Sequence, residues 1–564
     1  MPTAYKNRTT PGVYITELDA FPPSIVGVQT AVPAFIGYTE FAEINGRPVS
    51  NMAIKVGSLA DFELYFGGLY EAVYDIRHVP DPDKTSYDFS VKCPIGSPAC
   101  PPPGSPPGDY FYYSLHSEPP YIFNLYHSMR LFYANGGGNC YVVSVNSFEK
   151  ARSGNGINAE ELKRGLQVIQ EQVGPTMLVI PDAVLLPWND DDGDARLRMS
   201  APVPAPPQPT PKVHKSDDYK AVVTAMLNQC ALLQDRVAVL DVYSARSVSD
   251  ERTLNEVIAN FWESLGALDQ KTLSYGMAYF PYLNTSVVQL SDFTYANLSE
   301  TSDLQEILRM EAMNLYPDNA NKLEQVNELI DAMNLYDPQT DATDLQKVKA
   351  LNQNLVNAIP LLGNIEQVIV QKNSILPPSA AMAGVYTYND STRGVWNAPA
   401  NVGLVAVDKT TFKLNDKLQG ELNMPINGMA VNAVREFIGR GSVVWGARTL
   451  DGNSNDWRYI QVRRTIIYIE QSVKAALAPF VFAANTATTW VTVTAMVSNF
   501  LTNLWSQGGL MGAKASDAFT VTCGLGSTMT GQDVLNGYMI VQVTLQMIHP
   551  AEFIELTFKQ QMQS

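Results

Sequence analysis

Short apolar segments alternate with amphipathic segments between residues 139 and 283. The apolar, β-rich segments are residues 140–145, 176–182, 236–242 and 273–283. The amphipathic segments, in which apolar side chains recur three or four positions apart, are residues 159–173, 218–234 and 251–268. That spacing is typical of a helix with one apolar face. Strands alternating with such helices predict a mainly parallel sheet covered on both faces, so the expected fold class is α/β.

Three segments interrupt this alternation. Residues 76–120 and 187–215 are rich in proline, glycine and small polar residues, which indicates surface insertions made of loops. Residues 300–372 have helical spacing instead and are rich in Leu, Asn, Gln and acidic residues. We therefore interpret residues 284–372 as a helical insertion domain.

The C-terminal part has a different pattern. Apolar residues form one helical stripe within residues 458–480 and another within 488–505, where the stripe is Trp490, Val493, Val497, Phe500 or Leu501, and Leu504. Strand-like runs follow at 518–523, 538–549 and 552–559. This mixture predicts an α+β C-terminal domain.

The pattern divides the chain into five parts. They are an N-terminal arm with the first core strand (1–40), an α/β domain carrying the two proline-rich insertions (41–283), the helical insertion (284–372), a connecting segment (373–428) and the C-terminal domain (429–564). At 564 residues the chain is too long for one hydrophobic core, which agrees with several domains.

The extreme ends of the chain carry strand-like segments set off by prolines: GVYITEL at 12–18 and EFIELTFK at 552–559. Such strands can complete the sheet of a neighbouring subunit, or they can be ordinary edge strands of their own chain. The candidate intersubunit residues are Val13, Tyr14, Ile15, Thr16, Glu17, Leu18, Phe553, Ile554, Leu556 and Phe558.

Charge and hydropathy narrow the classes of partner. Against 39 Lys and Arg stand 56 Asp and Glu, a net charge of -17 that disfavours nucleic acid as the main partner. The sequence has neither an apolar run long enough to span a bilayer nor the apolar region of a signal peptide at its start. We expect cytoplasmic synthesis without membrane insertion. The five cysteines are expected to be reduced thiols.

The motifs of common enzymes are missing. The sequence has no Gly-Lys pair for a phosphate loop and no G-x-S-x-G nucleophile turn, and the triple glycine at 136–138 precedes a strand, as expected of a turn. We therefore assign no catalytic, cofactor-binding or metal-binding residues. The alternative that stays open is a cytoplasmic α/β hydrolase-like enzyme with a helical lid at 300–372.

One basic segment stands out in this acidic chain. Within residues 429–475, seven Lys or Arg and four Asp or Glu give a net charge of +3. Such a segment can be a docking face for an acidic partner; alternatively, the helix at 458–480 has a solvated basic face or pairs with acids of its own chain. The residues expected on the free face of the helix at 458–480 are Arg463, Arg464, Gln471 and Lys474.

Several long segments, in this order, resemble contractile tail sheath proteins, the family found in contractile phages, R-type pyocins and phage-tail-like injection particles. They are TPGVYITEL with PPSIVGVQTAVPAFIGYTE, then GGGNCYVV, PPSAAMAGVYTYNDSTRGVWNAPAN, INGMAVNAVREFIGRGSVVWGARTL, DWRYIQVRRTIIYIEQSV and HPAEFIELTF. The resemblance covers about residues 9–70, 120–283 and 375–560.

The resemblance implies a subtilisin-like but non-catalytic α/β domain, an α+β C-terminal sheath domain and terminal strand arms. It implies a structural subunit that polymerises helically around an inner tube and contracts to drive that tube through a target cell envelope. The implied partners are further copies of the chain, with or without paralogous sheath subunits, the inner tube protein, and baseplate and terminator or cap proteins. The implied location is the bacterial cytoplasm during assembly, then a virion tail or an injection particle, including extracellular ones. Arg463, Arg464, Gln471 and Lys474 become the candidate tube-facing residues.

Overall fold

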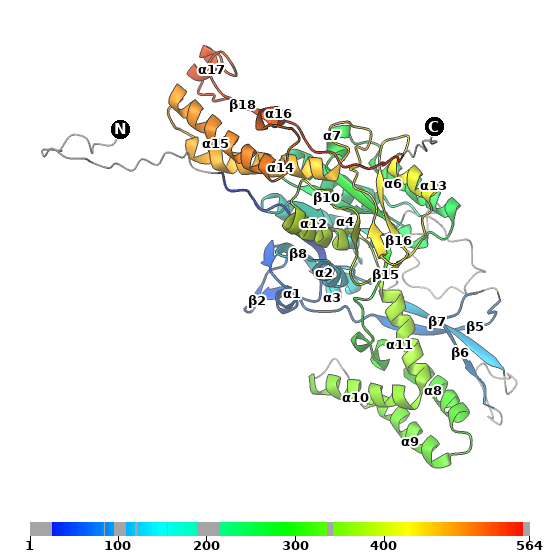
Figure 1. Ribbon diagram of the computed structural model, residues 1–564. Coiled ribbons are helices and arrows are strands. Elements are labelled where there is room, and N and C mark those ends of the chain that lie inside the picture. The colour runs from blue at the N-terminus through cyan, green and yellow to red at the C-terminus, as the bar shows by residue number, and fades with distance from the viewer. Residues whose placement is uncertain are drawn as a thin grey trace, which may run out of the picture. The chain divides into compact units, whose positions relative to one another are not determined.

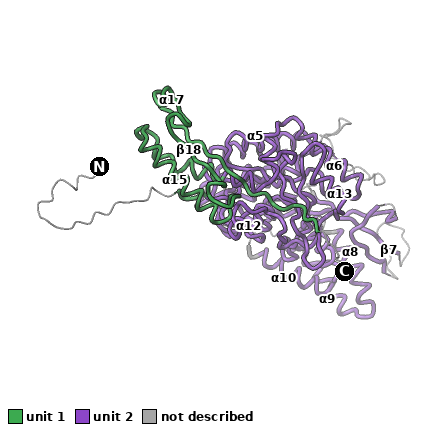
Figure 2. The backbone as a smooth tube through the Cα atoms, turned by 45° about the horizontal axis from the view of Figure 1, so that its top comes forward, with its two compact units in different colours: residues 1–28, 468–564 green, residues 29–467 purple. Residues whose placement is uncertain are grey.

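The computed structural model describes residues 25–83, 85–94, 109–118, 122–154, 156–188, 214–299, 301–335 and 342–556. The chain divides into two compact units, coloured separately in Figure 2. Unit 1 is Met1–Val28 with Tyr468–Ser564, and unit 2 is Gln29–Ile467. The division differs from the expected start of a C-terminal domain at residue 429, for a reason given below.

Unit 2 is built on a nine-stranded mixed sheet (Figure 1), in the order β14-β17-β16-β11-β10-β9-β1-β8-β4. The strands are β1 (Pro33–Thr39), β4 (Ile54–Val56), β8 (Cys140–Ser147), β9 (Met177–Val179), β10 (Val237–Asp241), β11 (Gly276–Phe280), β14 (Val402–Gly403), β16 (Val431–Phe437) and β17 (Gly441–Val444). From β8 to β16 all neighbours are parallel, whereas β4, β17 and β14 are antiparallel to their neighbours. The α/β class and the parallel centre predicted from residues 139–283 are confirmed.

Helices cover both faces of this sheet, as strand β1 shows. Successive side chains of a strand point to opposite faces. Phe35 packs against Phe132 of α2 (Leu125–Ala134), with ring centroids 5.1 Å apart. Its neighbour Ile36 packs against Gly165 of α4 (Ala159–Gln170), where a Cβ atom would come within 2.5 Å of the Ile36 side chain. Every residue of β1 is buried, so the strand forms the middle of the core.

Further helices flank these two. They are α5 (Asp217–Leu233), α6 (Glu251–Leu265), α7 (Gln270–Leu273) and α12 (Ser379–Arg393). Helix α5 packs beside α4, and α12 packs beside α2. The short elements of unit 2 are α1 (Leu59–Phe66), α3 (Phe148–Ser153), α13 (Asp416–Asn423), β2 (Glu43–Ile44), β3 (Arg47–Pro48) and β15 (Val407–Thr410).

The expected loop insertion at 76–120 contains a sheet instead. Strands β5 (Val73–Val79), β6 (Phe89–Lys92) and β7 (Tyr110–Glu118) form an antiparallel sheet in the order β5-β7-β6. The loop interpretation was wrong for these residues because alternate aromatic and aliphatic side chains, Phe111, Tyr113 and Leu115, are buried on one face. Residues 95–108 of this segment and 189–213 of the other proline-rich segment lie outside the described residues.

The described residues of the helical insertion form four α-helices: α8 (Thr301–Leu315), α9 (Ala320–Asp331), α10 (Ala342–Ala358) and α11 (Pro360–Asn373). The chain leaves and re-enters the body at one place, because β12 (Leu283–Thr285) pairs antiparallel with β13 (Ile375–Leu376). The Thr285 N–H donates to the carbonyl of Ser374 at 2.8 Å. The insertion also touches the three-stranded sheet, since α8 packs on β6 and Asn314 donates to the carbonyl of Lys92 at 2.7 Å.

The predicted boundary at residue 429 falls inside unit 2. Strand β16 pairs parallel with β11, with Ala278 opposite Val431, and β17 continues that sheet. Val431 and Ala433 are buried, so this hairpin completes the core rather than beginning a new one. The boundary between units falls instead within helix α14 (Ile460–Leu477).

Unit 1 contains the last turns of α14, helix α15 (Ala487–Ser506), two short helices, α16 (Ala515–Ala518) and α17 (Gly531–Leu535), and a ribbon of β18 (Phe519–Thr522) with β19 (Gln542–Leu545). The apolar stripe predicted for residues 488–505 is confirmed, because Val493, Val497 and Leu504 are among the buried residues of α15. The strand expected at 538–549 is shorter, covering only Gln542–Leu545.

Two further expectations from the sequence concern membrane spans and the state of the cysteines. No helix in the described residues is long and apolar enough to cross a membrane. Cys140, Cys230 and Cys523 are free thiols, but Cys93 is disulfide-bonded, contrary to the expectation of five reduced cysteines.

Candidate functional site

The carboxyl ends of the central parallel strands are where an α/β enzyme would hold its substrate. Two fully buried carboxylates lie there: Asp182 just after β9 and Asp241 at the end of β10. Asp241 accepts hydrogen bonds from the backbone N–H of Ser379, at 2.8 Å, and from its hydroxyl, at 2.5 Å. Because Ser379 begins α12, this contact fastens a helix to the sheet.

Asp182 has an equivalent structural role. Its carboxylate accepts the backbone N–H of Tyr38 in β1, at 3.0 Å, and that of Asn124 just before α2, at 2.7 Å. Burial raises the pKa of Asp182 to about 6 and that of Asp241 to about 7. Each carboxylate is engaged by backbone donors, so both act as joints between sheet and helix.

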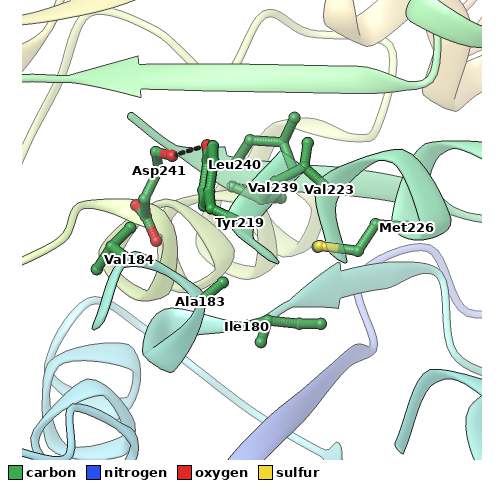
Figure 3. A pocket seen from close by; sticks show the side chains of 9 residues that line it. All are labelled: Ile180, Ala183, Val184, Tyr219, Val223, Met226, Val239, Leu240 and Asp241. Carbon is green, nitrogen blue, oxygen red and sulfur yellow. Dashed lines mark hydrogen bonds between the residues drawn. The ribbon is translucent and has the colours of Figure 1, made fainter. Parts of the chain in front are cut away.

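A cavity beside Asp241 is too small for a substrate. Its volume is about 10 Å³, room for roughly one water molecule. Figure 3 shows the nine residues that line it, which are apolar except for Tyr219 and Asp241. The Tyr219 hydroxyl donates to the Asp241 carbonyl at 2.6 Å, which closes the polar side. Within the described part of the chain, no group of three potential metal ligands occurs. This edge of the sheet is packed as a structural junction, which disfavours the hydrolase-like alternative.

The basic segment is organised differently from the expectation of a surface stripe. Arg464 and Asp390 of α12 form a two-bond ion pair, with distances of 2.9 and 2.6 Å and side-chain exposures of 3% and 4%. Arg464 also donates to the carbonyl of Thr30 at 3.1 Å and lies 4.5 Å from the ring centroid of Tyr386. Its guanidinium therefore holds the start of the first core strand and α12 together.

Arg463 is buried as well. Its guanidinium lies between two rings, 3.6 Å from the centroid of Trp457 and 4.3 Å from that of Tyr275, and donates to the Ser274 hydroxyl at 2.5 Å. The predicted exposure of Arg463 and Arg464 is thus wrong. The first turns of α14 are enclosed all round, because residues distant in sequence supply partners for both guanidinium groups.

The remaining residues of that prediction lie in the second half of α14. Gln471 is partly buried and Lys474 is exposed. Two other arginines of the basic segment pair with their own chain: Arg435 with Asp416 at 2.7 Å and Arg440 with the Asn401 side chain at 2.6 Å. Of the interpretations left open by the sequence, pairing with acids of the same chain therefore describes Arg435 and Arg464, whereas Arg440 and Arg463 bind neutral side chains.

The stretch that follows Lys474 carries no charge at all. Residues 475–513 contain no Asp, Glu, Lys, Arg or His. The stretch includes α15 and the turn before it, where Phe482 has a φ of 66° and a fully exposed ring. A bulky residue in the left-handed region is rare and costs free energy, so this turn is a strained, apolar protrusion.

The predicted strand arms are only partly visible. Residues 12–18, with Val13, Tyr14, Ile15, Thr16, Glu17 and Leu18, lie outside the described residues, as does Phe558. Residues 551–556 belong to no strand in the subunit. Phe553, Ile554 and Leu556 are exposed by 73%, 79% and 75%. Apolar side chains this exposed are typical of a segment that binds another surface.

Unit 1 also contains an incomplete sheet. Strands β18 and β19 pair only with each other in the described residues, from Phe519 opposite Leu545 to Thr522 opposite Gln542. A two-stranded ribbon is marginally stable alone and presents backbone donors and acceptors along both edges. We did not predict from the sequence that this ribbon could receive a strand; the signal available was the pair of β-rich runs at 518–523 and 538–549.

Comparisons with known proteins agree with these features. Residues 453–561 match the family model of the phage tail sheath C-terminal domain. The chain is similar to the sheath of PVC, an extracellular contractile injection system, in its contracted state, with 25% identity and a TM-score of 0.51 over 98% of both chains. The contracted helical sheath of the anti-feeding prophage shares the fold at 24% identity and a TM-score of 0.53, over 98% of this chain and 100% of that chain. No curated protein sequence matches the chain.

The domain match covers the part of the chain that holds α15, the open ribbon and the exposed C-terminal segment. The likeness to solved sheaths extends over nearly the whole length. Together these matches confirm the resemblance predicted from the sequence: residues 453–561 form a phage tail sheath C-terminal domain, and over 98% of its length the chain resembles solved contractile sheaths.

Proposed function

We propose that this protein is the subunit of a helical sheath that surrounds an inner tube, is held together by strand exchange, and contracts to drive the tube through a target cell envelope. The observation that carries the proposal is the ribbon β18–β19, which pairs with no third strand among the described residues, in the same unit as the exposed segment at Phe553–Leu556. One subunit thus offers both a sheet that lacks strands and a segment suited to become a strand.

The chemistry of strand addition suits this pairing. Backbone hydrogen bonds supply affinity, and alternate side chains supply register. When the segment of one subunit adds to the ribbon of the next, donor and acceptor surfaces differ, so the contact repeats without closing and generates a helix of subunits. Two packings of the same rigid bodies, joined by such arms, can differ in free energy and so drive contraction without a nucleotide.

The proposed partners are other copies of this chain, the inner tube, and the baseplate and terminator proteins at the two ends. A likeness to the anti-feeding prophage baseplate structure, at 23% identity and a TM-score of 0.50, shows the shared fold. For the tube contact, the burial of Arg463 and Arg464 leaves Gln471 and Lys474 as candidate residues. We propose that Lys474 supplies one positive charge per subunit at that contact, close in sequence to the uncharged helix α15.

Electron microscopy of purified subunits tests the proposal. The full chain should form tubes or rings, and a variant that ends at residue 546, after β19, should remain a folded monomer. A matched control keeps the length but replaces Phe553, Ile554 and Leu556 with Ser, which retains the backbone and removes the apolar side chains. This variant should assemble weakly, because it can still form the backbone hydrogen bonds but lacks the side chains that fix the register. Polymers formed normally by the truncated chain would contradict the proposal.

A further inference from the structure

A short strap, defined here as residues 25–30, follows one stripe of helix α14. The helix residues that contact it are Arg464, Tyr468 and Ser472, at positions i, i+4 and i+8. Residues spaced by four lie on the same face of a helix, over a length of about 12 Å here. The contacts differ in strength. We call those with Tyr468 and Ser472 the outer group and those around Arg464 the inner group.

The outer group holds Gly27 and Val28. The Val28 N–H donates to the Ser472 hydroxyl at 3.1 Å, and that hydroxyl donates to the Tyr468 carbonyl at 2.6 Å. A side chain at position 27 would overlap the Tyr468 hydroxyl, so the strap approaches the helix closely only because residue 27 is glycine. The Tyr468 ring lies 5.9 Å from that of Phe500 in α15. The outer group thus holds the strap by one neutral hydrogen bond, from Val28 to Ser472, and by the close approach of Gly27 to the Tyr468 ring.

The inner group is much stronger. The carbonyl of Thr30 accepts from Arg464, at 3.1 Å, and from the Thr176 hydroxyl, at 2.8 Å. Arg464 is itself fixed by its ion pair with Asp390, and the Val32 N–H donates to Thr176 at 2.9 Å. Charge-assisted, two-bond pairs in buried positions are stronger than neutral hydrogen bonds near the surface.

We propose that the strap is a releasable length of tether. A pull on the chain ahead of residue 25 would break the outer contacts first and free residues 25–29, whereas the contacts at Thr30 would stop the release. Five residues of extended chain span roughly 17 Å. The subunit thereby carries a defined reserve of reach that lengthens its N-terminal arm without disturbing the first core strand. The source of the pull, a neighbouring subunit, rests on the proposed function.

The exposure of the strap supports this order of events. Val26 is 80% exposed, and residues 27 and 29 are exposed too, so Ile25, with an exposure of 9%, is the one buried side chain of the outer part. By contrast Val32 and the strand that follows are buried. Release of the outer part therefore costs one hydrogen bond and the burial of the Ile25 side chain, whereas release beyond residue 30 would open the core.

Amide hydrogen exchange in the isolated subunit tests the strap without any assembly. In the Ser472→Ala variant the Val28 amide loses its acceptor and should exchange roughly five- to tenfold faster, the effect of one net hydrogen bond. The Val32 amide should not change. Thr502→Ala is the matched control, because Thr502 makes the same bond to the carbonyl four residues earlier, that of Ser498, but lies in α15 away from the strap. Gly27→Ala should accelerate Val28 exchange by a separate route.

The same measurement on assembled sheath tests the release. The Val28 amide should lose protection on assembly or on contraction, and the Val32 amide should keep it. Unchanged exchange at Val28 in both Ser472→Ala and Gly27→Ala would overturn the outer contacts. If the Val28 amide stays protected in both the extended and the contracted polymer, the strap is not released. If the Val32 amide loses protection together with the Val28 amide, the contacts at Thr30 do not stop the release. Failure of the chain to polymerise would count instead against the proposed function, since the isolated-subunit result does not depend on it.

Discussion

Arg464 and Asp390 form an ion pair that is almost completely buried, and each side chain uses two atoms in it. The cost of removing both charges from water offsets most of the attraction between them, so the net contribution of the pair to stability is small. Either partner alone, however, would be a buried, uncompensated charge. The pair therefore fixes which residues meet rather than how tightly the protein folds.

Replacing one member of the pair should be far worse than replacing both. Arg464→Met should lower the free energy of unfolding by about 3–5 kcal/mol, because it strands the Asp390 carboxylate. Arg464→Met with Asp390→Leu should recover most of that loss. As a control, Arg435→Met breaks a pair whose acid, Asp416, is 94% exposed, and should cost less than about 1 kcal/mol. Urea unfolding of the three variants checks this, and a double variant as unstable as the single one would contradict it.

Lys474 is the charge left for a tube contact, so Lys474→Glu should weaken binding of the sheath to isolated tubes and leave sheath-only polymers intact. An ionic contact is screened by salt, so the binding of the parent should fall as ionic strength rises, and the variant should show less of this dependence. Co-sedimentation of subunits with tubes measures both. Lys514→Glu, another exposed lysine of unit 1, serves as the control for charge alone. Equal salt dependence in parent and Lys474→Glu would exclude this residue from the contact.

Deleting residues 1–20 should leave a folded, soluble subunit that does not polymerise, because the deleted strand would have bonded to another subunit. The removed residues lie ahead of the strap, so its contacts with α14 are kept. Circular dichroism and sedimentation velocity on the purified variant give fold and assembly separately. Loss of the folded monomer would show that the segment belongs to its own subunit.

The helical insertion should be dispensable only together with the sheet it covers. The Tyr74 hydroxyl accepts from Asn373 at 2.6 Å, and Phe111, Tyr113 and Leu115 form the buried face of the sheet against which α8 packs. Excising 287–372 alone should therefore expose apolar surface and cause aggregation. Excising 74–117 as well, each with a short linker, should restore a soluble subunit that forms tubes. Light scattering and electron microscopy distinguish the two variants. If the variant lacking only 287–372 is soluble, the helices and the three-stranded sheet do not depend on each other.

Acid should destabilise the subunit through His127 in α2, whose ring is fully buried. Burial, with a further contribution from Arg130, lowers its pKa to about 4, against the opposing effect of Asp292. The unfolded chain takes up a proton near pH 6.5, so the stabilising contribution is present above that pH and is lost as the pH falls towards 4. Between pH 7 and pH 5 the loss is about 2 kcal/mol.

The variant His127→Leu isolates this effect. Asp182 and Asp241, whose pKa values are raised, act in the opposite sense, but they are present in both proteins and cancel in the comparison. Urea titrations at pH 7 and pH 5 should show a smaller stability difference for His127→Leu than for the parent. The same difference in both proteins would show that His127 does not carry the pH dependence.

Local periodicity predicted those parts of the structure that depend on neighbours in sequence. The strand at Val237–Asp241 and the helix at Ala487–Ser506 both follow from short-range patterns, since one apolar run or stripe determines which face is buried. The strands at 73–118 were missed because proline and glycine between them resemble loop composition. Arg463 and Arg464 were misplaced because their partners, Ser274 and Asp390, lie 189 and 74 positions away, and no local pattern marks such a pairing.

The hydrogen bond between Thr285 and Ser374 has a practical consequence. Because the chain departs from and returns to the body at adjacent residues, whatever stands between them needs only ends that meet at that spacing. A foreign domain with neighbouring termini, such as an enzyme or an antigen, could be cloned between residues 286 and 373 in place of the native helices, once the sheet at 74–117 that they cover has been excised with them. Every subunit of a polymer would then display one copy, at a density set by the helical repeat, and the particle would become a scaffold for multivalent presentation.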